Sequence, residues 1–258
     1  MGLKKAIRRR LRRIGVLRDV EAVKIEQAAR YFAMFGGVVA HGPFSGFRMQ
    51  KTQYWSHYDA TAKLFGLYEK EVADRLVALS ASHDTFIDIG AADGYFGVAA
   101  VCCGHFQQSV CFEISPAGRQ SIRHAAELNG VADRVDVRGE ADATELKQVI
   151  DQCPGPAAVL IDIEGAEFAF LTDEVIDSLA SCHVIIELHD WLTKDGAALR
   201  DSLMDRLSGR FRSHLVHTGA RDLSNFPELA DLPDSERWLV CDEGRGRSME
   251  WLFLEPIS

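Results

Sequence analysis

Three features typical of exported or membrane-spanning proteins are missing from this sequence. No apolar run approaches the roughly 20 residues needed to span a bilayer. The N-terminus has no apolar stretch of the kind found in secretory signals. None of the six cysteines belongs to a Cys-x-x-Cys pair, and several lie in apolar runs, where a thiol packs as a small hydrophobic group. We therefore expect a cytoplasmic protein with reduced cysteines.

Acidic residues are absent from the first 18 positions, which carry eight lysines and arginines. The remaining chain has 21 basic against 38 acidic residues, a net charge of about −17. Such a charge disfavours nucleic acid as a partner. The charge asymmetry separates a basic segment from an acidic body.

The basic segment has helical periodicity. Its apolar residues follow the spacing of one helix face and are Leu3, Ile7, Leu11, Ile14 and Leu17. A basic amphipathic helix can lie on an anionic membrane surface, here the inner face of the membrane. It can equally pack on its own domain or on a second subunit, as in a homo-oligomer. The sequence leaves both alternatives open for residues 1–18.

From residue 84 onward, short apolar strands alternate with helices. The expected strands are 85–89, 109–113, 134–138, 157–161 and 184–188. The expected helices between and after them are 95–103, 116–129, 143–151, 166–179 and 196–208. This alternation predicts parallel strands with right-handed crossovers.

The two ends of the chain depart from this alternation. A helix over 20–35 and one around 64–79 precede it, and strand candidates at 211–217, 237–241 and 249–254 follow it. We expect a terminal antiparallel pair. The predicted fold is a doubly wound α/β fold with a mostly parallel, seven-stranded sheet over 50–258, preceded by a basic helical N-terminal extension over 1–49.

A glycine-rich turn, Asp88-Ile-Gly-Ala-Ala-Asp-Gly-Tyr-Phe-Gly97, connects the first of these strands to its helix. Glycines allow close approach of a ligand at this edge of the sheet. Asp88 suits a cationic ligand end, and Asp93 would repel a pyrophosphate, so the turn favours S-adenosylmethionine (SAM) over a dinucleotide. The cofactor contacts expected from the turn are Asp88, Gly90, Ala91, Asp93, Gly94, Tyr95 and Phe96.

Carboxylates follow the next two strands as well. Glu113, with Ile114 beside it, suits hydrogen bonds from both ribose hydroxyls, a feature that NAD enzymes share. Glu140, Ala141 and Asp142 follow the third strand and suit the adenine ring. Asp142 is alternatively the N-cap of the helix at 143–151, and the two roles are compatible.

Acidic residues are concentrated after the fourth and fifth strands, in Asp162-Ile-Glu164-Gly-Ala-Glu167 and Glu187-Leu-His189-Asp190. Such a concentration is costly unless a positive charge lies nearby. Asp162, Glu164 or His189 could take a proton from an acceptor hydroxyl, and Asp162 is also an expected cofactor contact. Alternatively, Asp162, Glu187 and Asp190 could bind Mg²⁺. A third alternative is that Glu164 and Glu187 are hydrogen-bonded structural acids.

Aromatic residues crowd the segment before the helix around 64–79, at Tyr54, Trp55, His57 and Tyr58. They could line an acceptor pocket or anchor the N-terminal helices on the sheet. We favour anchoring for at least two of them.

The motifs at 88–97, Glu113, 161–167 and 186–189 resemble those of the FkbM family of class I SAM-dependent methyltransferases, over roughly residues 68–190. The resemblance implies O-methylation of a hydroxyl on a sugar, polyketide or similar small-molecule or glycan acceptor. It also implies a place in surface-polysaccharide biosynthesis. The sequence departs from the commonest pattern at Ala92, where a glycine is frequent; alanine tolerates the turn if its φ is negative.

Two alternatives compete with this interpretation. A nucleotide-dependent oxidoreductase has a similar sheet, but the Asp-rich turn and the missing Gly-x-Gly-x-x-Gly disfavour it. A non-catalytic SAM-fold scaffold bound to the membrane through residues 1–18 is the other. The intact acidic motifs at Asp162, Glu164, Glu187 and His189 disfavour that scaffold.

Overall fold

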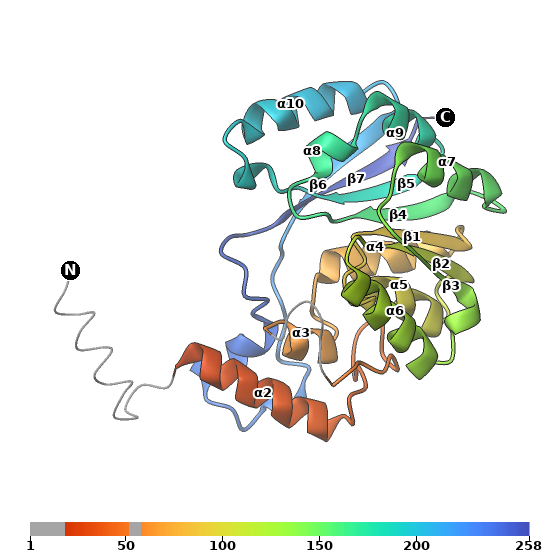
Figure 1. Cartoon of the computed structure of the whole chain (residues 1–258). Helices are drawn as coiled ribbons and strands as arrows, with labels where there is room; N and C mark the ends of the chain where they lie inside the picture. Colours follow the sequence, from red (N-terminus) through yellow and green to blue (C-terminus); the bar gives the residue numbers. More distant parts are fainter. Residues whose placement is uncertain (1–18, 52–57, 258) are drawn as a thin grey trace.

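The computed structural model describes residues 19–51 and 58–257, which form a seven-stranded sheet in the order β3-β2-β1-β4-β5-β7-β6 (Figure 1). The first five strands are mutually parallel, and β7 pairs antiparallel with both β5 and β6. The strands are β1 (Thr85–Ile89), β2 (Gln108–Phe112), β3 (Val135–Arg138), β4 (Ala157–Ile161), β5 (His183–Glu187), β6 (Phe211–His217) and β7 (Glu250–Pro256). This confirms the predicted fold class, in the strand order typical of class I methyltransferases.

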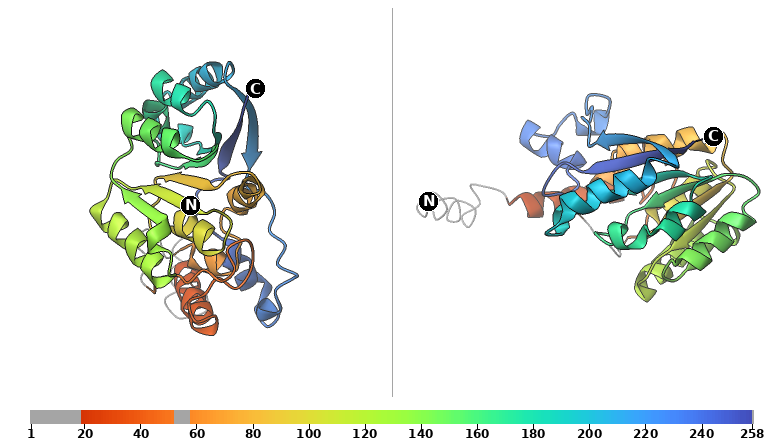
Figure 2. Two further views of the ribbon diagram at one scale, coloured as in Figure 1. Left: turned by 90° about the vertical axis from the view of Figure 1, so that its right-hand side faces the viewer. Right: turned by 90° about the horizontal axis from the view of Figure 1, so that it is seen from above.

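Helices cover both faces of the sheet (Figure 2). One face carries α4 (Lys70–Ser80), α5 (Tyr95–Cys102) and α6 (Pro116–Leu128). The other carries α7 (Ala143–Gln152), α8 (Glu167–Phe170), α9 (Asp173–Ser178) and α10 (Gly196–Leu207). Central strands are buried on both faces, which explains their continuous apolar sequences.

Alternate strand residues divide between two hydrophobic clusters. In β1, Phe86 belongs to the cluster under α4 to α6, whereas Ile87 and Ile89 belong to the cluster under α7 to α10. In β4, Leu160 and Ile161 divide in the same way. The period of two along each strand thus separates the two cores, and the carboxyl ends of β1, β2 and β4 are left free to hold a ligand.

The N-terminal helix α2 (Val20–Met34) packs against a segment from the other end of the chain (Figures 1 and 2). Lys24 donates to the carbonyl of Asp242, and Gln27 donates to that of Glu236. That segment, between β6 and β7, folds as η3 (Pro227–Leu229), α11 (Asp234–Arg237) and η4 (Trp238–Cys241). Tyr31 of α2 is fully buried in the cluster that α4 to α6 also share, so α2 contributes a side chain to the main core.

Three predicted elements are wrong in detail. The helix expected around 64–79 is two helices, α3 (Ala60–Leu64) and α4, and the chain between them turns at Glu69, whose φ of 40° is left-handed. The strand expected at 237–241 is the helical turn η4, because Pro233 starts a short helix there and Val240 is its one fully buried side chain. The helix expected over 166–179 is two helices, α8 and α9. They separate at Leu171, whose ψ of 63° is not helical, and Thr172 caps α9 by accepting from the amide of Val175.

Several expectations concern parts of the chain that lie outside the described residues. These are the basic helix over 3–17 and the aromatics Tyr54, Trp55 and His57. In the two ranges that are described, no helix combines the length and apolarity needed to cross a bilayer. The remaining elements are η1 (Ala132–Arg134) and η2 (Asp190–Leu192).

Candidate cofactor site and acidic cluster

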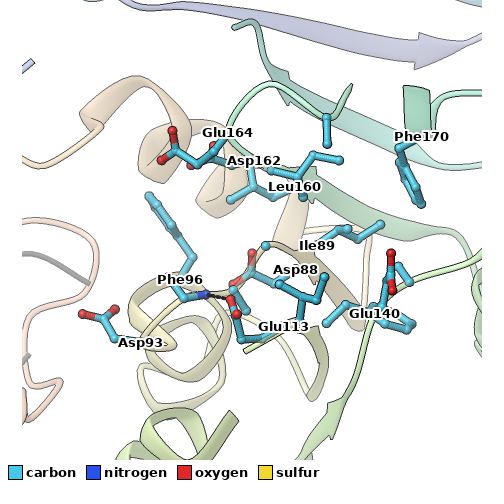
Figure 3. Close-up of a pocket in the computed structure, with 18 of the residues that line it drawn as sticks. Asp88, Ile89, Asp93, Phe96, Glu113, Glu140, Leu160, Asp162, Glu164 and Phe170 are labelled. Atoms are coloured by element: carbon cyan, nitrogen blue, oxygen red, sulfur yellow. Dashed lines mark hydrogen bonds between the residues drawn. The ribbon is translucent and has the colours of Figure 1, made fainter. Parts of the chain in front are cut away.

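A cavity of about 520 Å³ opens at the carboxyl ends of β1, β2 and β4 (Figure 3). Asp93, Phe96, Asp162 and Glu164 lie on one side of it, with Glu140 and Phe170 on the other. The sequence-predicted site residues that line it are Asp88, Gly90, Ala91, Asp93, Tyr95, Phe96, Glu113, Ile114, Glu140, Ala141, Asp162 and Glu164. Those that do not are Gly94, Asp142, Glu187, His189 and Asp190.

The turn after β1 needs its glycines for two different reasons. Gly90 has a φ of +93°, and a Cβ there would lie 1.7 Å from the carbonyl oxygen of Asp162. Gly97, inside α5, has no room for a side chain because a Cβ would lie 2.3 Å from the sulfur of Cys111. These contacts bring the turn against β4 and α5 against β2, and so shape the cavity.

Ala92 lies in the same turn with a φ of +48°. The condition under which alanine tolerates the turn, a negative φ, is therefore not met: the chain enters the left-handed region that favours glycine. An alanine in that region costs about 1–2 kcal/mol relative to an unstrained residue.

Asp88 is the buried carboxylate of the turn, with only 3% of its surface exposed. Burial raises its pKa to about 7, although a hydrogen bond from the amide of Gly97 opposes the shift. The nearby charges of Glu113 and Asp93 raise the pKa further. A cationic ligand group beside Asp88 would relieve this cost by stabilising the carboxylate.

Glu113, directly after β2, is held by two backbone amides. Ala92 donates to its Oε2 at 2.9 Å, and Ser115 donates to its Oε1 at 2.7 Å. Gly118 makes room for the side chain, because a Cβ there would lie 2.6 Å from Glu113 Cγ. Both oxygens are fixed, and each keeps a lone pair with which to accept a hydroxyl hydrogen bond.

At the third strand, Glu140 and Ala141 line the cavity and Asp142 does not. Asp142 caps α7, because its carboxylate accepts from the amide of Glu145 at 2.8 Å. Of the two roles open for Asp142, the structure thus shows the N-cap. Phe170, which sequence reasoning missed, lies on the same side of the cavity as Glu140, above it in Figure 3.

Lys63 is a second residue that sequence reasoning missed. Its side chain is buried, with Nζ 3.4 Å from Asp93 Oδ2 and 3.2 Å from Asp59 Oδ2. Although burial lowers the pKa of Lys63, the charges of Asp93 and Asp59 outweigh it and raise the pKa to about 12. The lysine therefore stays charged and neutralises the negative charge of Asp93. From the sequence alone, Asp93 is a charge that would repel a pyrophosphate.

Arg245 supplies positive charge beside the acidic strand ends. Its guanidinium pairs with Glu187 at the end of β5, with the buried Glu69 that precedes α4, and with Glu243 at 3.0 Å. Burial and the charge of Glu187 raise the pKa of Glu69 to about 8, even though Arg245 lowers it. Nothing in the sequence marks Arg245, since it lies 58 residues from Glu187 in an irregular segment.

The segment that carries Arg245 is itself fixed by ion pairs. Arg221 binds Glu71 of α4 at 2.6 Å and Glu243 at 3.4 Å. Glu243 also accepts from the backbone amide of Glu69 at 3.2 Å. A network of charges therefore ties the connection between β6 and β7 to the start of α4.

His189 lies behind the cavity wall with 3% of its surface exposed. Its Nδ1 is 2.9 Å from Glu167 Oε1, and its Nε2 is 3.6 Å from Glu164 Oε2 and 4.0 Å from Asp162 Oδ1. Burial lowers its pKa, but the hydrogen bond and charge of Glu167 outweigh this, so the pKa is raised above its usual value. A raised pKa and a position off the cavity both disfavour His189 as the base that meets substrate.

Asp190 does not join this cluster. Its Oδ2 is 3.7 Å from Arg200 of α10, and it belongs to neither group of metal-capable side chains among the described residues. Those groups are Asp162, Glu164 and His189, and Glu69, Asp162 and Glu187. Of the set Asp162, Glu187 and Asp190, the structure brings Asp162 and Glu187 together but not Asp190, because η2 turns that side chain toward α10.

No family model and no curated protein matches the chain. Among solved structures, it is similar to an O-methyltransferase from Bacillus cereus in complex with SAH, at 12% identity and a TM-score of 0.47 over 97% of each chain. It is also similar to the tRNA methyltransferase TrmK from B. subtilis, at 15% identity and a TM-score of 0.45, over 70% of this chain and 64% of that one.

A third similar structure is the precorrin-6y C5,15-methyltransferase from Geobacter metallireducens, at 15% identity and a TM-score of 0.45 over 81% of this chain and 93% of that one. These similarities concern the fold alone. The sheet order 3-2-1-4-5-7-6, with the antiparallel strand in sixth place, by itself gives the architectural conclusion: the chain has the fold of class I SAM-dependent methyltransferases.

Proposed function

We propose that this protein is a SAM-dependent O-methyltransferase that methylates a hydroxyl of a small-molecule or glycan acceptor. The observation that carries the proposal is the orientation of Glu113 by the amides of Ala92 and Ser115 at the cavity. Two fixed carboxylate oxygens suit the two adjacent hydroxyls of a ribose. Asp88, buried in the same cavity, suits the ammonium group at the other end of SAM.

The residues that line the cavity support one arrangement of SAM, with its adenine at one side and its methionine end toward the other (Figure 3). The adenine ring would lie between Glu140 and Phe170, and the ribose on Glu113. The methionine end would lie on Asp88 and the turn at Gly90. This placement directs the sulfonium toward the side of the cavity where Asp162 and Glu164 lie.

Methyl transfer needs little more than alignment and removal of one proton. The acceptor oxygen attacks the methyl carbon, the carbon–sulfur bond breaks, and S-adenosylhomocysteine (SAH) leaves with the electron pair. The hydroxyl proton leaves to the acidic side of the cavity, at Asp162 and Glu164. A bound Mg²⁺, one of the alternatives that the sequence leaves open, would also belong there, without Asp190 as a ligand.

The acceptor class rests on the FkbM resemblance, which favours a sugar, polyketide or related hydroxyl and a role in surface-polysaccharide biosynthesis. A nucleic-acid acceptor, which the name of TrmK indicates for that enzyme, is disfavoured by the acidic body of this chain. Contact of residues 1–18 with the membrane and homo-oligomerisation stay predictions. For the first of these, deleting residues 1–18 should reduce partition onto anionic vesicles.

Turnover with acceptor panels tests the proposed reaction. The full-length protein is incubated with SAM and with hydroxylated sugars, glycans and polyketides, and SAH release and methylated product are followed by mass spectrometry. The proposal expects an alkali-stable methyl ether on one acceptor class. Methyl esters, N-methyl products or methylated RNA would contradict the O-methyltransferase assignment while leaving SAM binding intact.

A further inference from the structure

The histidine of the acidic cluster is held in one orientation by a buried carboxylate. Glu167, with no exposed surface, accepts from His189 Nδ1 at 2.9 Å. The same oxygen accepts from the amides of Ile163 at 3.2 Å and Gly165 at 3.1 Å. When the ring is neutral, its proton therefore lies on Nδ1, and the lone pair of Nε2 points away from Glu167. A carboxylate on the far nitrogen is the arrangement that commonly orients metal-binding histidines.

The side of the ring that carries Nε2 faces carboxylate oxygens that stand too far away to bond to it. Glu164 Oε2 lies at 3.6 Å, Glu187 Oε1 at 3.8 Å and Asp162 Oδ1 at 4.0 Å; among these three, within the described residues, Glu187 alone is paired with an arginine, Arg245. An N–H donor would draw a carboxylate to about 2.7–3.2 Å. By contrast, atoms that bind one metal ion at about 2.0–2.2 Å lie about 3–4.4 Å from one another. The observed separations fit two ligands on a shared ion better than they fit an ion pair.

An independent observation comes from Asp162. Its Oδ1, the atom that faces His189 Nε2, is buried and has no hydrogen-bond partner within the described ranges. A buried carboxylate oxygen without a partner is costly, and native structures normally satisfy such atoms. A cation between Asp162 Oδ1 and His189 Nε2 would satisfy both.

From this geometry we infer that Asp162, Glu164 and His189 bind a divalent transition-metal ion, with Glu167 as the residue that positions the histidine. The imidazole ligand favours Mn²⁺, Fe²⁺ or Zn²⁺ over Mg²⁺, which prefers oxygen ligands and water. Three protein ligands leave coordination positions open.

The neighbouring acids do not compete for this ion. Glu187 and Glu69 form the second metal-capable group with Asp162, but Arg245 pairs with both of them. The guanidinium thus neutralises that half of the cluster. The half formed by Asp162, Glu164 and His189 has no arginine or lysine within ion-pair distance among the described residues.

The site faces the acceptor side of the cavity, because Asp162 and Glu164 line it (Figure 3). On the proposed function, the bound ion would hold the acceptor hydroxyl and make its proton easier to lose. Glu167 would hold the imidazole ring of His189 in place, and Asp162 and Glu164 would hold the ion at the cavity wall.

Binding of Mn²⁺ to the metal-free full-length protein tests the inference without any cofactor. Free Mn²⁺ is followed by electron paramagnetic resonance, and Zn²⁺ is added as a competitor. We expect about one Mn²⁺ per chain, displaced by Zn²⁺, whereas a large excess of Mg²⁺ displaces it weakly. Glu164→Gln, at a half-exposed side chain, should weaken Mn²⁺ binding more than tenfold, and Glu167→Gln should weaken it about 10–100-fold.

Asp190→Asn is the matched control, because Asp190 lies one residue from His189 but pairs with Arg200. The affinity of Asp190→Asn for Mn²⁺ should stay within about twofold of that of the unaltered protein. Absence of Mn²⁺ and Zn²⁺ binding at millimolar concentration would overturn the site. Equal weakening by Asp190→Asn and Glu164→Gln would overturn it as well. Because SAH binding is measured separately, a protein that binds SAH but no metal would refute this site and leave the proposed function standing.

Discussion

Gly90 and the carbonyl oxygen of Asp162 meet across the ends of β1 and β4, so closely that a Cβ on Gly90 would lie 1.7 Å from that oxygen. Asp162 in turn donates its amide to the carbonyl of Ile89 at 2.9 Å. The glycine turn that suits the cofactor and the acidic motif that suits the acceptor are therefore one packed unit. A change in either should displace the other.

Gly90→Ala should destabilise this unit. The clash is with backbone, and the φ of +93° is unfavourable for alanine, so we expect the free energy of unfolding to fall by about 3 kcal/mol or more, with loss of SAH binding. Gly130→Ala is the control, since Gly130 also has a positive φ but nothing within 4 Å of its Cβ position. The control should lose about 1–2 kcal/mol and keep SAH affinity. Equal effects in urea denaturation would refute the packing argument.

Ala92→Gly should stabilise the protein. Its φ of +48° strains an alanine and suits a glycine, so the free energy of unfolding should rise by about 1 kcal/mol. The amide of Ala92 still donates to Glu113 after the substitution, so SAH affinity should change less than threefold. A decrease in thermal stability would show that the methyl group contributes packing that outweighs the strain.

Arg245→Met should be strongly destabilising, because it leaves Glu69 and Glu187 buried without their cation. Removing one partner of a buried ion pair costs about 3–5 kcal/mol. Arg247→Met, two residues away on an exposed side chain, should change stability by no more than about 0.5 kcal/mol. If both variants unfold at the same denaturant concentration, Arg245 does not neutralise the acidic strand ends.

The pH dependence of SAH binding should report on Asp88. Its pKa in the free protein is raised to about 7 by burial, so it is largely protonated at lower pH. Binding of the SAH ammonium group favours the carboxylate, hence binding releases a proton below pH 7. Affinity should rise by up to about tenfold per pH unit as pH increases toward 7, and then level off.

The raised pKa of Asp88 has the opposite effect on the stability of the ligand-free protein. The folded protein holds the proton of Asp88 more tightly than the unfolded chain, so the free energy of unfolding should fall as pH rises from about 4 to about 7. Asp88→Asn should flatten both dependences relative to the unaltered protein. An unchanged pH profile of SAH affinity in Asp88→Asn would exclude Asp88 as the source.

Much of the fold could be predicted because its signals are local. Continuous apolar runs such as 157–161, followed by polar residues, indicate buried parallel strands, and Asn129-Gly130 ends a helix where α6 ends. The turn at 237–241 was mistaken for a strand because an apolar run of that length fits either structure. The helix that begins after Pro233 continues into this turn, which packs against α2 and α3, elements far away in the sequence.

The site residues likewise fall into two groups, those that local sequence signals located and those that depend on tertiary packing. Residues at or directly after strand ends, such as Asp88, Glu113 and Asp162, were found because parallel strands end at one edge of the sheet. Lys63 and Arg245 were missed because their partners are set by tertiary packing, and neither sits in a motif. Asp190 was misplaced because a turn of 3₁₀ helix directs it toward Arg200, which strand order alone does not reveal.

Calorimetric titration with SAH and, separately, with NAD tests the central claim most directly. Glu113→Gln removes one of the two fixed oxygens, whereas Glu127→Gln, on the exposed face of α6, serves as the control. We expect micromolar SAH binding by the unaltered protein and by Glu127→Gln, and binding about 10–100-fold weaker by Glu113→Gln. Tight binding of NAD in place of SAH, or SAH affinity that Glu113→Gln leaves unchanged, would contradict the claim.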